Sequence, residues 1–212
     1  TTADRPGLSQ PWIVSGVDRA TAMVVSTSGG GSAYGGTPSD ASVIAAITEL
    51  KRRGLKVVLY PFVMMDIAAG TALPDPYGGA AQAVYPWRGR ITCHPAPGRP
   101  GTADKTVAAR TQVAGFEGTA LPAQFSTAGG AVAFTGTAGD WGYRRFVLHY
   151  AHLANAAGGV DGFLLGSELR GLTTLRDGAG AFPFVETLCA LADQVRTLLG
   201  PATAITYGAD WS

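Results

Sequence analysis

The stretch GGVDGFLLGSELRGL, residues 158–172, changes character within a few positions. Residues 160–166 are almost wholly apolar. They are followed directly by Ser167 and Glu168 and, two positions later, by Arg170. A short run that is apolar on both faces is typical of a strand in a parallel sheet, and parallel α/β folds form their sites at the carboxyl ends of such strands. We therefore expect a strand over 160–166 and take Glu168 as the first candidate functional residue.

The same strand pattern recurs along the chain and alternates with amphipathic helices. Further short apolar runs occupy residues 22–27, 55–63 and 203–208. Apolar residues spaced by three and four predict helices over residues 38–54, 140–159 and 182–201. Ser39 and Asp140 are the expected N-caps of the first two helices, and Gly54 suits the left-handed position after the first. Alternating strands and helices predict an α/β fold.

The number of strands bears on which α/β fold this is. An open doubly wound sheet and a (β/α) barrel both fit the alternation. A complete barrel takes about 250 residues, whereas only four or five strands are visible here. We therefore expect residues 1–212 to form part of a TIM-barrel-like (β/α)8 domain, with the remainder beyond residue 212. The sequence begins without Met, and we expect it to be a piece of a longer protein.

A long segment, residues 67–140, separates the second strand from the helix that follows it. A helix from Asp104 to about Phe116 and a hairpin around Gly129 and Gly130 fit within it. The remainder is rich in proline and is predicted to be ordered loop. Loops of this length are uncommon unless they are functional or linking, so we treat the segment as a loop-rich insertion.

Composition and motifs exclude several classes of function. Sixteen basic and fifteen acidic side chains give a net charge of +1, so we expect no nucleic-acid partner. No apolar run approaches the roughly 18 residues of a membrane span, and the N-terminus is not a signal peptide. Cys93 and Cys189 are too few for a disulfide framework, which is compatible with synthesis in the cytoplasm.

Neither a cofactor nor a metal ion is indicated by the motifs. The glycine-rich residues 26–40 lack the phosphate-loop pattern and are better explained as a mobile loop after a strand. The Cys93–His94 pair has no second pair at ligand spacing, and no further ligand is evident for His149 and His152. We therefore expect no cofactor and no metal site.

Three acidic residues follow predicted strands and are the candidate catalytic groups: Glu168, Asp66 and Asp210. Glycoside hydrolysis uses two carboxylates across one cleft, and burial beside apolar residues can raise the pKa of a carboxyl group toward that of a general acid. Two structural alternatives stay open. Glu168 could instead pair with Arg170 within its loop, and each aspartate could be an N-cap or an Asx-turn.

Aromatic residues near the same strand ends are candidates for sugar binding. Trp211, Tyr207 and Tyr60 could form a stacking wall, because a sugar ring offers an apolar face to an aromatic ring. Trp87 stands in YPWRGRITCHP, residues 85–95, which suits a lid or binding rim. Core packing is the alternative for the two tyrosines, and packing over the barrel mouth is the alternative for Trp87.

Five motifs follow one another in the chain: AYGGTPSDASVIAAITELKRRGLKVVLYPFVMMDI (33–67), YPWRGRITCHPAPG (85–98), WGYRRFVLHYAHLA (141–154), GGVDGFLLGSELRGLTTLRD (158–177) and ITYGADWS (205–212). Together they resemble the gene-transfer-agent TIM-barrel-like domain, found in a large tail-tip protein of phage-like particles and related prophages. The resemblance extends from about Pro11 to the last residue.

The resemblance implies a glycoside-hydrolase-like barrel on a baseplate or host-specificity protein that meets the recipient cell surface. Its expected partners are other tail proteins and cell-surface polysaccharide or peptidoglycan glycan. Glu168 matches the acid/base position that related glycosidases place after the fourth strand, and Ser167 stands where those enzymes usually carry Asn. A second carboxylate is expected beyond Ser212. Two hypotheses follow: a glycosidase that uses Glu168, and a non-catalytic structural or glycan-binding module of the tail tip.

Overall fold

A computed structural model of the chain describes residues 27–28, 31–32, 38–65, 67, 70, 72, 74–84 and 86–210. In chain order its elements are β1 (Thr27–Ser28), β2 (Gly31–Ser32), α1 (Asp40–Arg52), β3 (Val58–Leu59), the 3₁₀ helix η1 (Arg88–Arg90), α2 (Val107–Glu117), the 3₁₀ helix η2 (Pro122–Gln124), β4 (Phe125–Ala128), β5 (Ala131–Phe134), α3 (Tyr143–Ala156), β6 (Gly162–Ser167), α4 (Arg170–Thr173), α5 (Pro183–Leu199) and β7 (Ala204–Gly208). The strands β3, β6 and β7 form a parallel sheet, whereas β1–β2 and β4–β5 are antiparallel pairs.

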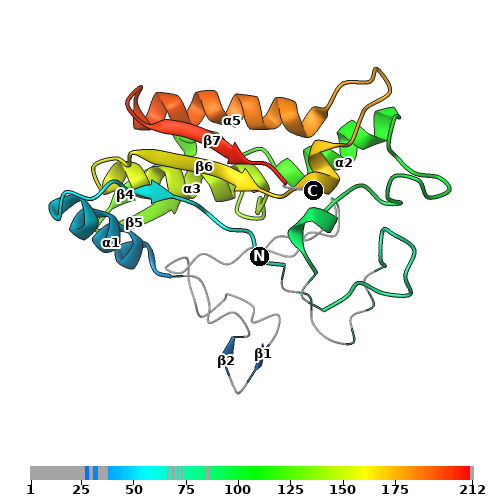
Figure 1. The fold of residues 1–212 in the computed structure, drawn as a ribbon, viewed down its shortest axis with the longest axis horizontal. Coiled ribbons are helices and arrows are strands. Elements are labelled where there is room, and N and C mark those ends of the chain that lie inside the picture. The colour runs from blue at the N-terminus through cyan, green and yellow to red at the C-terminus, as the bar shows by residue number, and fades with distance from the viewer. Residues whose placement is uncertain are drawn as a thin grey trace.

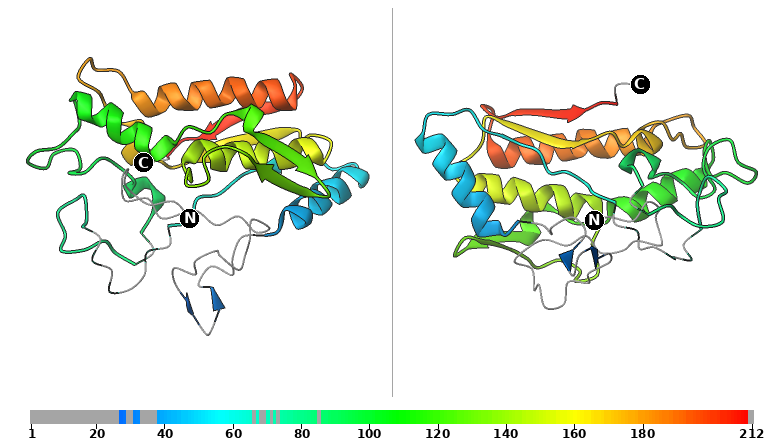
Figure 2. Two further views of the ribbon diagram at one scale, coloured as in Figure 1. Left: turned by 180° about the vertical axis from the view of Figure 1, so that it is seen from behind. Right: turned by 60° about the horizontal axis from the view of Figure 1, so that its bottom comes forward.

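The parallel sheet has the order β3–β6–β7, so the three strands of this sheet lie side by side in the order in which they occur in the chain (Figure 1). Val58 pairs with Gly162, and Gly162 pairs with Ala204. The helices that connect these strands, α3 and α5, lie on the same face of the sheet (Figure 2). A doubly wound sheet carries helices on both faces, whereas a barrel wall carries them only on the outside. The described residues therefore have the layering of a barrel wall, but they form an open sheet and not a closed barrel.

Side chains alternate strictly along the extended segment around β3. From residue 57 to residue 65 the odd-numbered side chains are buried or half-buried, and the even-numbered ones are exposed. Phe163 and Leu165 of β6 are buried in the core that α3 and α5 cover. Tyr60 and Phe62 point to the opposite, open face, where their side chains are 37% and 43% exposed. In a barrel this open face would line the interior.

The insertion packs on the helical layer and is not a free loop. The hairpin β4–β5 contacts α3, and α2 contacts both α3 and α5. As a result every residue of α3 from Arg145 to Ala154 is buried. The sequence predicts an amphipathic helix with one buried face. The helix is amphipathic, but both of its sides are buried, because the insertion covers the side that a barrel helix normally turns to solvent.

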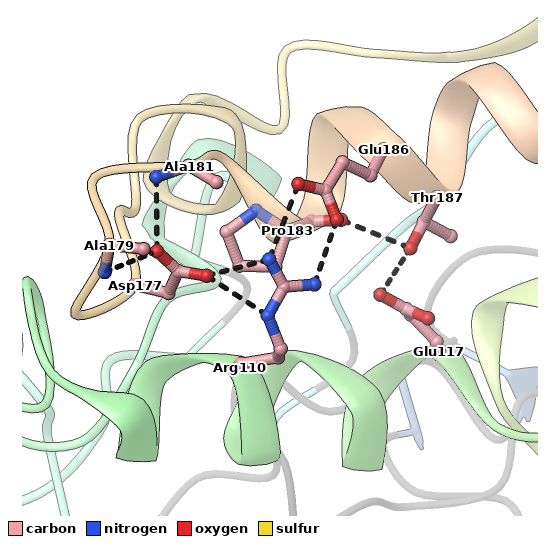
Figure 3. Close-up of polar contacts among 8 residues, drawn as sticks. All are labelled: Arg110, Glu117, Asp177, Ala179, Ala181, Pro183, Glu186 and Thr187. Atoms are coloured by element: carbon pink, nitrogen blue, oxygen red, sulfur yellow. Dashed lines mark hydrogen bonds and ion pairs between the residues drawn. The ribbon is translucent and has the colours of Figure 1, made fainter.

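A cluster of charged side chains fastens α2 to α5 (Figure 3). Arg110 of α2 donates hydrogen bonds to Asp177, at 2.6 and 3.0 Å, and to Glu186, at 2.8 and 3.2 Å. Beside them Glu117 accepts a hydrogen bond from the hydroxyl group of Thr187. We call these five residues the α2 clamp.

The structure confirms most predicted elements and corrects two further details. Ser39 caps α1, its hydroxyl group accepting the amide of Ser42 at 3.1 Å, and Gly54 follows with φ of 73°. Asp140 is not the N-cap of α3. That cap is Gly142, and Asp140 instead accepts the amide hydrogens of Gly142 and Thr119, which joins the end of α2 to the start of α3.

The second correction concerns strand lengths near the N-terminus. The predicted strand over 55–63 shrinks to Val58–Leu59, because Pro61 has no amide hydrogen to donate to a neighbouring strand. Of the strand expected over 22–27, only Thr27 lies within the described residues, and it pairs antiparallel with Ser32. The predicted insertion helix and the hairpin around Gly129 and Gly130 are confirmed as α2 and β4–β5.

Candidate functional site

Glu168 is the first residue after β6, and its backbone is held in an uncommon conformation. Its φ is 53°, in the left-handed region that a residue with a side chain rarely occupies. The amide of Glu168 donates to Gly208 O at 3.0 Å, and the amide of Leu169 donates to the hydroxyl group of Tyr207 at 2.8 Å. Such a conformation costs about 1–3 kcal/mol and persists only where its surroundings impose it. Here β7 imposes it from one side.

The carboxylate of Glu168 is contacted by two residues of the insertion. The indole nitrogen of Trp87 donates to Oε2 at 3.1 Å, and Nη2 of Arg88 lies 2.5 Å from the same oxygen. Trp87 donates a hydrogen bond and Arg88 forms an ion pair, so both groups complement a negatively charged carboxylate. Glu168 thus joins the end of β6 to η1, about eighty positions earlier in the chain.

Arg88 is almost buried, with 9% of its surface exposed, and it lies between two strand ends. Its Nε donates to the carbonyl oxygen of Ser167 at 3.2 Å, and Nη2 lies 3.4 Å from the hydroxyl oxygen of Ser167. Its guanidinium group also lies 3.6 Å from the centre of the Phe62 ring. Charge pairing, hydrogen bonding and ring contact together fix this side chain in one position.

Tyr60 and Ser167 meet on the open face of the sheet. The register shifts between Leu164 and Ser167, so that Ser167 pairs with Gly208 and its hydroxyl group contacts that of Tyr60. The structure therefore places Tyr60 at the strand end beside Glu168 and not in the hydrophobic core.

Trp87 lies beside the carboxylate with 44% of its surface exposed. One side of its indole packs against Gly89, where an added Cβ atom would come within 2.3 Å of the ring. Only glycine allows the ring to fold back this closely. Trp87 therefore presents a fixed and partly exposed aromatic ring next to Glu168.

A second group of predicted residues lies around a groove between α5 and β7. The groove has a volume of about 570 Å³, and its apolar lining includes Val185, Leu188, Cys189 and Ala192 of α5 and Ile205 of β7. Arg170, Tyr207 and Asp210 also line it, whereas Glu168 does not. Burial raises the pKa of Tyr207, whose hydroxyl group connects the groove to the loop of Glu168.

The pairing of Glu168 with Arg170, one of the alternatives from the sequence, is wrong. Glu168 pairs with Arg88, because η1 reaches the strand end from the other side, and Nη1 of Arg170 lies 4.0 Å from Oδ2 of Asp210. Asp66 and Trp211 lie outside the described residues.

The histidines considered as metal ligands have other contacts. Nε2 of His149 lies 3.0 Å from Oδ1 of Asp40, in a pair that is almost fully buried, and His152 stacks on Phe125. Within the described ranges, no three His, Cys, Asp or Glu side chains are grouped so that they could hold a metal ion.

A family match covers the segment that carries β6, β7 and Glu168. Residues 141–212 match the family described as the GTA TIM-barrel-like domain. No curated protein matches the chain. None of the helices described in the structure has the length and apolar character needed to cross a membrane.

The matched segment supplies only part of the candidate site. Ser167 and Glu168 lie inside the matched segment, whereas Tyr60, Trp87 and Arg88 precede it. The resemblance of residues 33–98 to the same family stays a prediction.

Sequence reasoning placed Arg88 in a possible binding rim but did not predict its ion pair with Glu168. The signal was present, because Arg88 follows Trp87 directly in the stretch identified as a binding rim. Its role was hidden because contact with Glu168 depends on how the insertion folds back on the domain.

Proposed function

We propose that this chain is part of a glycoside-hydrolase-like barrel that acts on cell-envelope glycan, with Glu168 as general acid/base. The observation that carries the proposal is the position of Glu168. It is a carboxylate at the carboxyl end of a parallel strand, in a left-handed backbone conformation, beside an exposed indole ring. Uncommon backbone conformations and carboxylates at such strand ends are both frequent at catalytic sites.

The proposed chemistry is proton transfer to the leaving group. Protonated Glu168 donates its proton to the glycosidic oxygen while the bond from that oxygen to the anomeric carbon breaks, and the bonding electrons go to the oxygen. The carboxylate that remains then takes a proton from water, which adds to the anomeric carbon.

A second carboxylate is needed for this reaction. The resemblance places it beyond residue 212, and within the chain Asp210 and Asp66 are the proposed candidates. Asp210 follows β7, as Glu168 follows β6, and its side chain is 12% exposed. A separation of about 5–5.5 Å between the two carboxyl groups gives retention of anomeric configuration, and about 6.5–9.5 Å gives inversion.

Sugar binding is assigned to the aromatic and hydroxyl groups around Glu168. Trp87 offers a ring face for stacking, and Tyr60 offers a hydroxyl group on the open face of the sheet. Ser167 is buried and holds the hydroxyl group of Tyr60 in place. Tyr207, Arg170 and Trp211 are proposed to extend this binding surface past the end of β7.

The test is release of new reducing ends from purified envelope polysaccharide and peptidoglycan by the full chain. We expect Glu168→Gln to lose about a hundredfold or more of the rate, as removal of a general acid does. Glu49→Gln is the matched control, because Glu49 is an exposed carboxylate on α1 that pairs with its neighbours Arg52 and Arg53. Release that survives Glu168→Gln would contradict the proposal.

The setting we propose is the tail tip of a phage-like particle, after synthesis in the cytoplasm. The support is the gene-transfer-agent family of residues 141–212. Other tail and baseplate proteins are the proposed protein partners, and surface glycan of the recipient cell is the proposed target. Immunogold labelling of purified particles tests this setting, and label found away from the tail would contradict it.

A second candidate is a non-catalytic module of the tail tip, structural or binding surface glycan without cleaving it. The ion pair between Arg88 and Glu168 favours this candidate, because a general acid must carry a proton and both donors complement the charged carboxylate. Glycan binding without release of reducing ends, weakened by Trp87→Ala but not by Glu168→Gln, is the result expected of a binding module.

A further inference from the structure

The 3₁₀ helix η1 lies directly against α4, the short helix that follows Glu168. A Cβ atom at Gly171 of α4 would come within 2.4 Å of Ile91 O and 2.7 Å of Gly89 O. Glycine at position 171 therefore permits the close approach of the two backbones. This contact brings the insertion to the strand end where Glu168 stands.

The side chain that η1 delivers there is fixed on several sides. Arg88 is 9% exposed and contacts Phe62 beyond β3 and Ser167 at the end of β6. It thus spans two neighbouring strand ends. Its position is set independently of Glu168, so it can act as a fixed anchor for that residue.

Both contacts to the carboxylate of Glu168 fall on one oxygen. Arg88 Nη2 and Trp87 Nε1 lie 2.5 and 3.1 Å from Oε2. The backbone of Glu168 is held separately, through Gly208 O and the hydroxyl group of Tyr207 at the next amide. With the backbone and one oxygen held, the direction of the second oxygen is determined.

We propose that Arg88 is a positioning residue that holds Oε2 of Glu168 and so presents Oε1 to the substrate. The insertion is then part of the site. The inference rests on the proposed function in one respect, that Oε1 carries the proton which is transferred. The positioning itself can be tested without any catalytic activity.

The first measurement is the indole N–H resonance of Trp87 in the full chain, assigned by its disappearance in Trp87→Phe. If Arg88 positions Glu168, Arg88→Met releases the carboxylate and the resonance moves to the position of an indole without a carboxylate partner. Glu168→Gln gives the reference for a neutral acceptor. The matched control is Arg90→Met, because Arg90 is also in η1 but pairs with Asp75 and stacks on Tyr77.

The second measurement is the rate of glycan cleavage. We expect Arg88→Met to lower kcat about a hundredfold with little change in KM, because a misplaced group loses rate more than binding. Arg88→Lys, which keeps the charge, should recover part of the loss. If Arg88→Met does not fold, Arg88→Lys and Gly171→Ala take its place, the latter moving η1 without changing its side chains.

The outcomes separate this inference from the proposed function. A shifted indole resonance with lost kcat supports both. A shifted resonance in a native protein that cleaves no glycan supports the positioning and counts against the proposed function. An unchanged resonance in Arg88→Met overturns the positioning, and so does an unchanged kcat in a variant whose resonance has shifted.

Discussion

His149 and His152 lie on neighbouring turns of α3, yet their surroundings differ. His149 forms a buried pair with Asp40, whereas Nε2 of His152 is buried and has no hydrogen-bond partner among the described residues. Burial lowers the pKa of His152, so the folded state favours its neutral ring. A buried ring nitrogen without a partner lowers the stability of the fold, and protonation would lower it further.

This difference predicts the effect of His152→Phe on stability at acid pH. The pKa of His152 is lower in the folded state than in the unfolded state, where it is near 6.5. As the pH falls, the unfolded state therefore binds the proton first. The stability of the fold is highest above the unfolded pKa and is lost as the pH falls toward the folded pKa. Phe keeps the stacking on Phe125 and removes this loss. Between pH 7.5 and pH 5, we expect the Tm of the variant to fall less than that of the native protein, with a difference on the order of 2 °C.

Thermal unfolding followed by circular dichroism across this pH range measures the effect. His94→Gln is the control, because His94 is half-buried in the insertion and lies far from α3 in sequence. Parallel pH profiles for the native protein and His152→Phe would show that His152 is not the titrating group.

Among the elements, α2 depends most clearly on a few charged contacts. Arg110 lowers the pKa of both Asp177 and Glu186 through hydrogen bonds. Acids with lowered pKa values stabilise the fold above their ordinary values of 3.8 and 4.5, and this stability is lost as the pH falls through the folded values. The α2 clamp is therefore expected to open in acid.

We expect Arg110→Met to loosen α2 at neutral pH while leaving the parallel sheet intact. Amide hydrogen exchange should speed up about tenfold or more in residues 107–117, because local opening no longer breaks the ion pairs. Arg52→Met is the control, since Arg52 forms an exposed pair with Glu49 within α1. The Tm difference between native protein and Arg110→Met should shrink below pH 4. A difference that persists there would mean that the stem of Arg110, and not its charge, holds α2.

The elements also show what the sequence can predict. The spacing of apolar residues predicts α1, α3 and α5, and Gly129 and Gly130 predict the hairpin, because these signals are local. The buried outer side of α3 was not predictable in this way, because it depends on the insertion. The same holds for the site. Glu168 follows from its strand, whereas Arg88 reaches it through a contact that no local pattern records.

At the scale of the whole molecule, the edge of β7 and the groove beside it indicate which kind of element packs there. In the described part of the chain β7 has a strand partner on one side only, and the groove between it and α5 is apolar. Since α3 and α5 lie on one face of the sheet and parallel strands are joined by right-handed crossovers, a helix following β7 would lie beside α5 on that face. We therefore propose that chain beyond residue 212 continues the barrel and covers the apolar part of this groove, along α5.

Cys189 reports whether the groove is covered, because it lies in the lining and is exposed, whereas Cys93 is buried. We expect a thiol reagent to label Cys189 rapidly in a chain that ends at residue 212. In a longer chain that continues the barrel, labelling should be about tenfold slower or more, since only an accessible thiolate reacts. Cys93 serves as the internal control, and its slow labelling in both chains shows that each is folded. Equal labelling of Cys189 in the two chains would mean that the following segment does not pack on α5, and that the sheet is completed in another way.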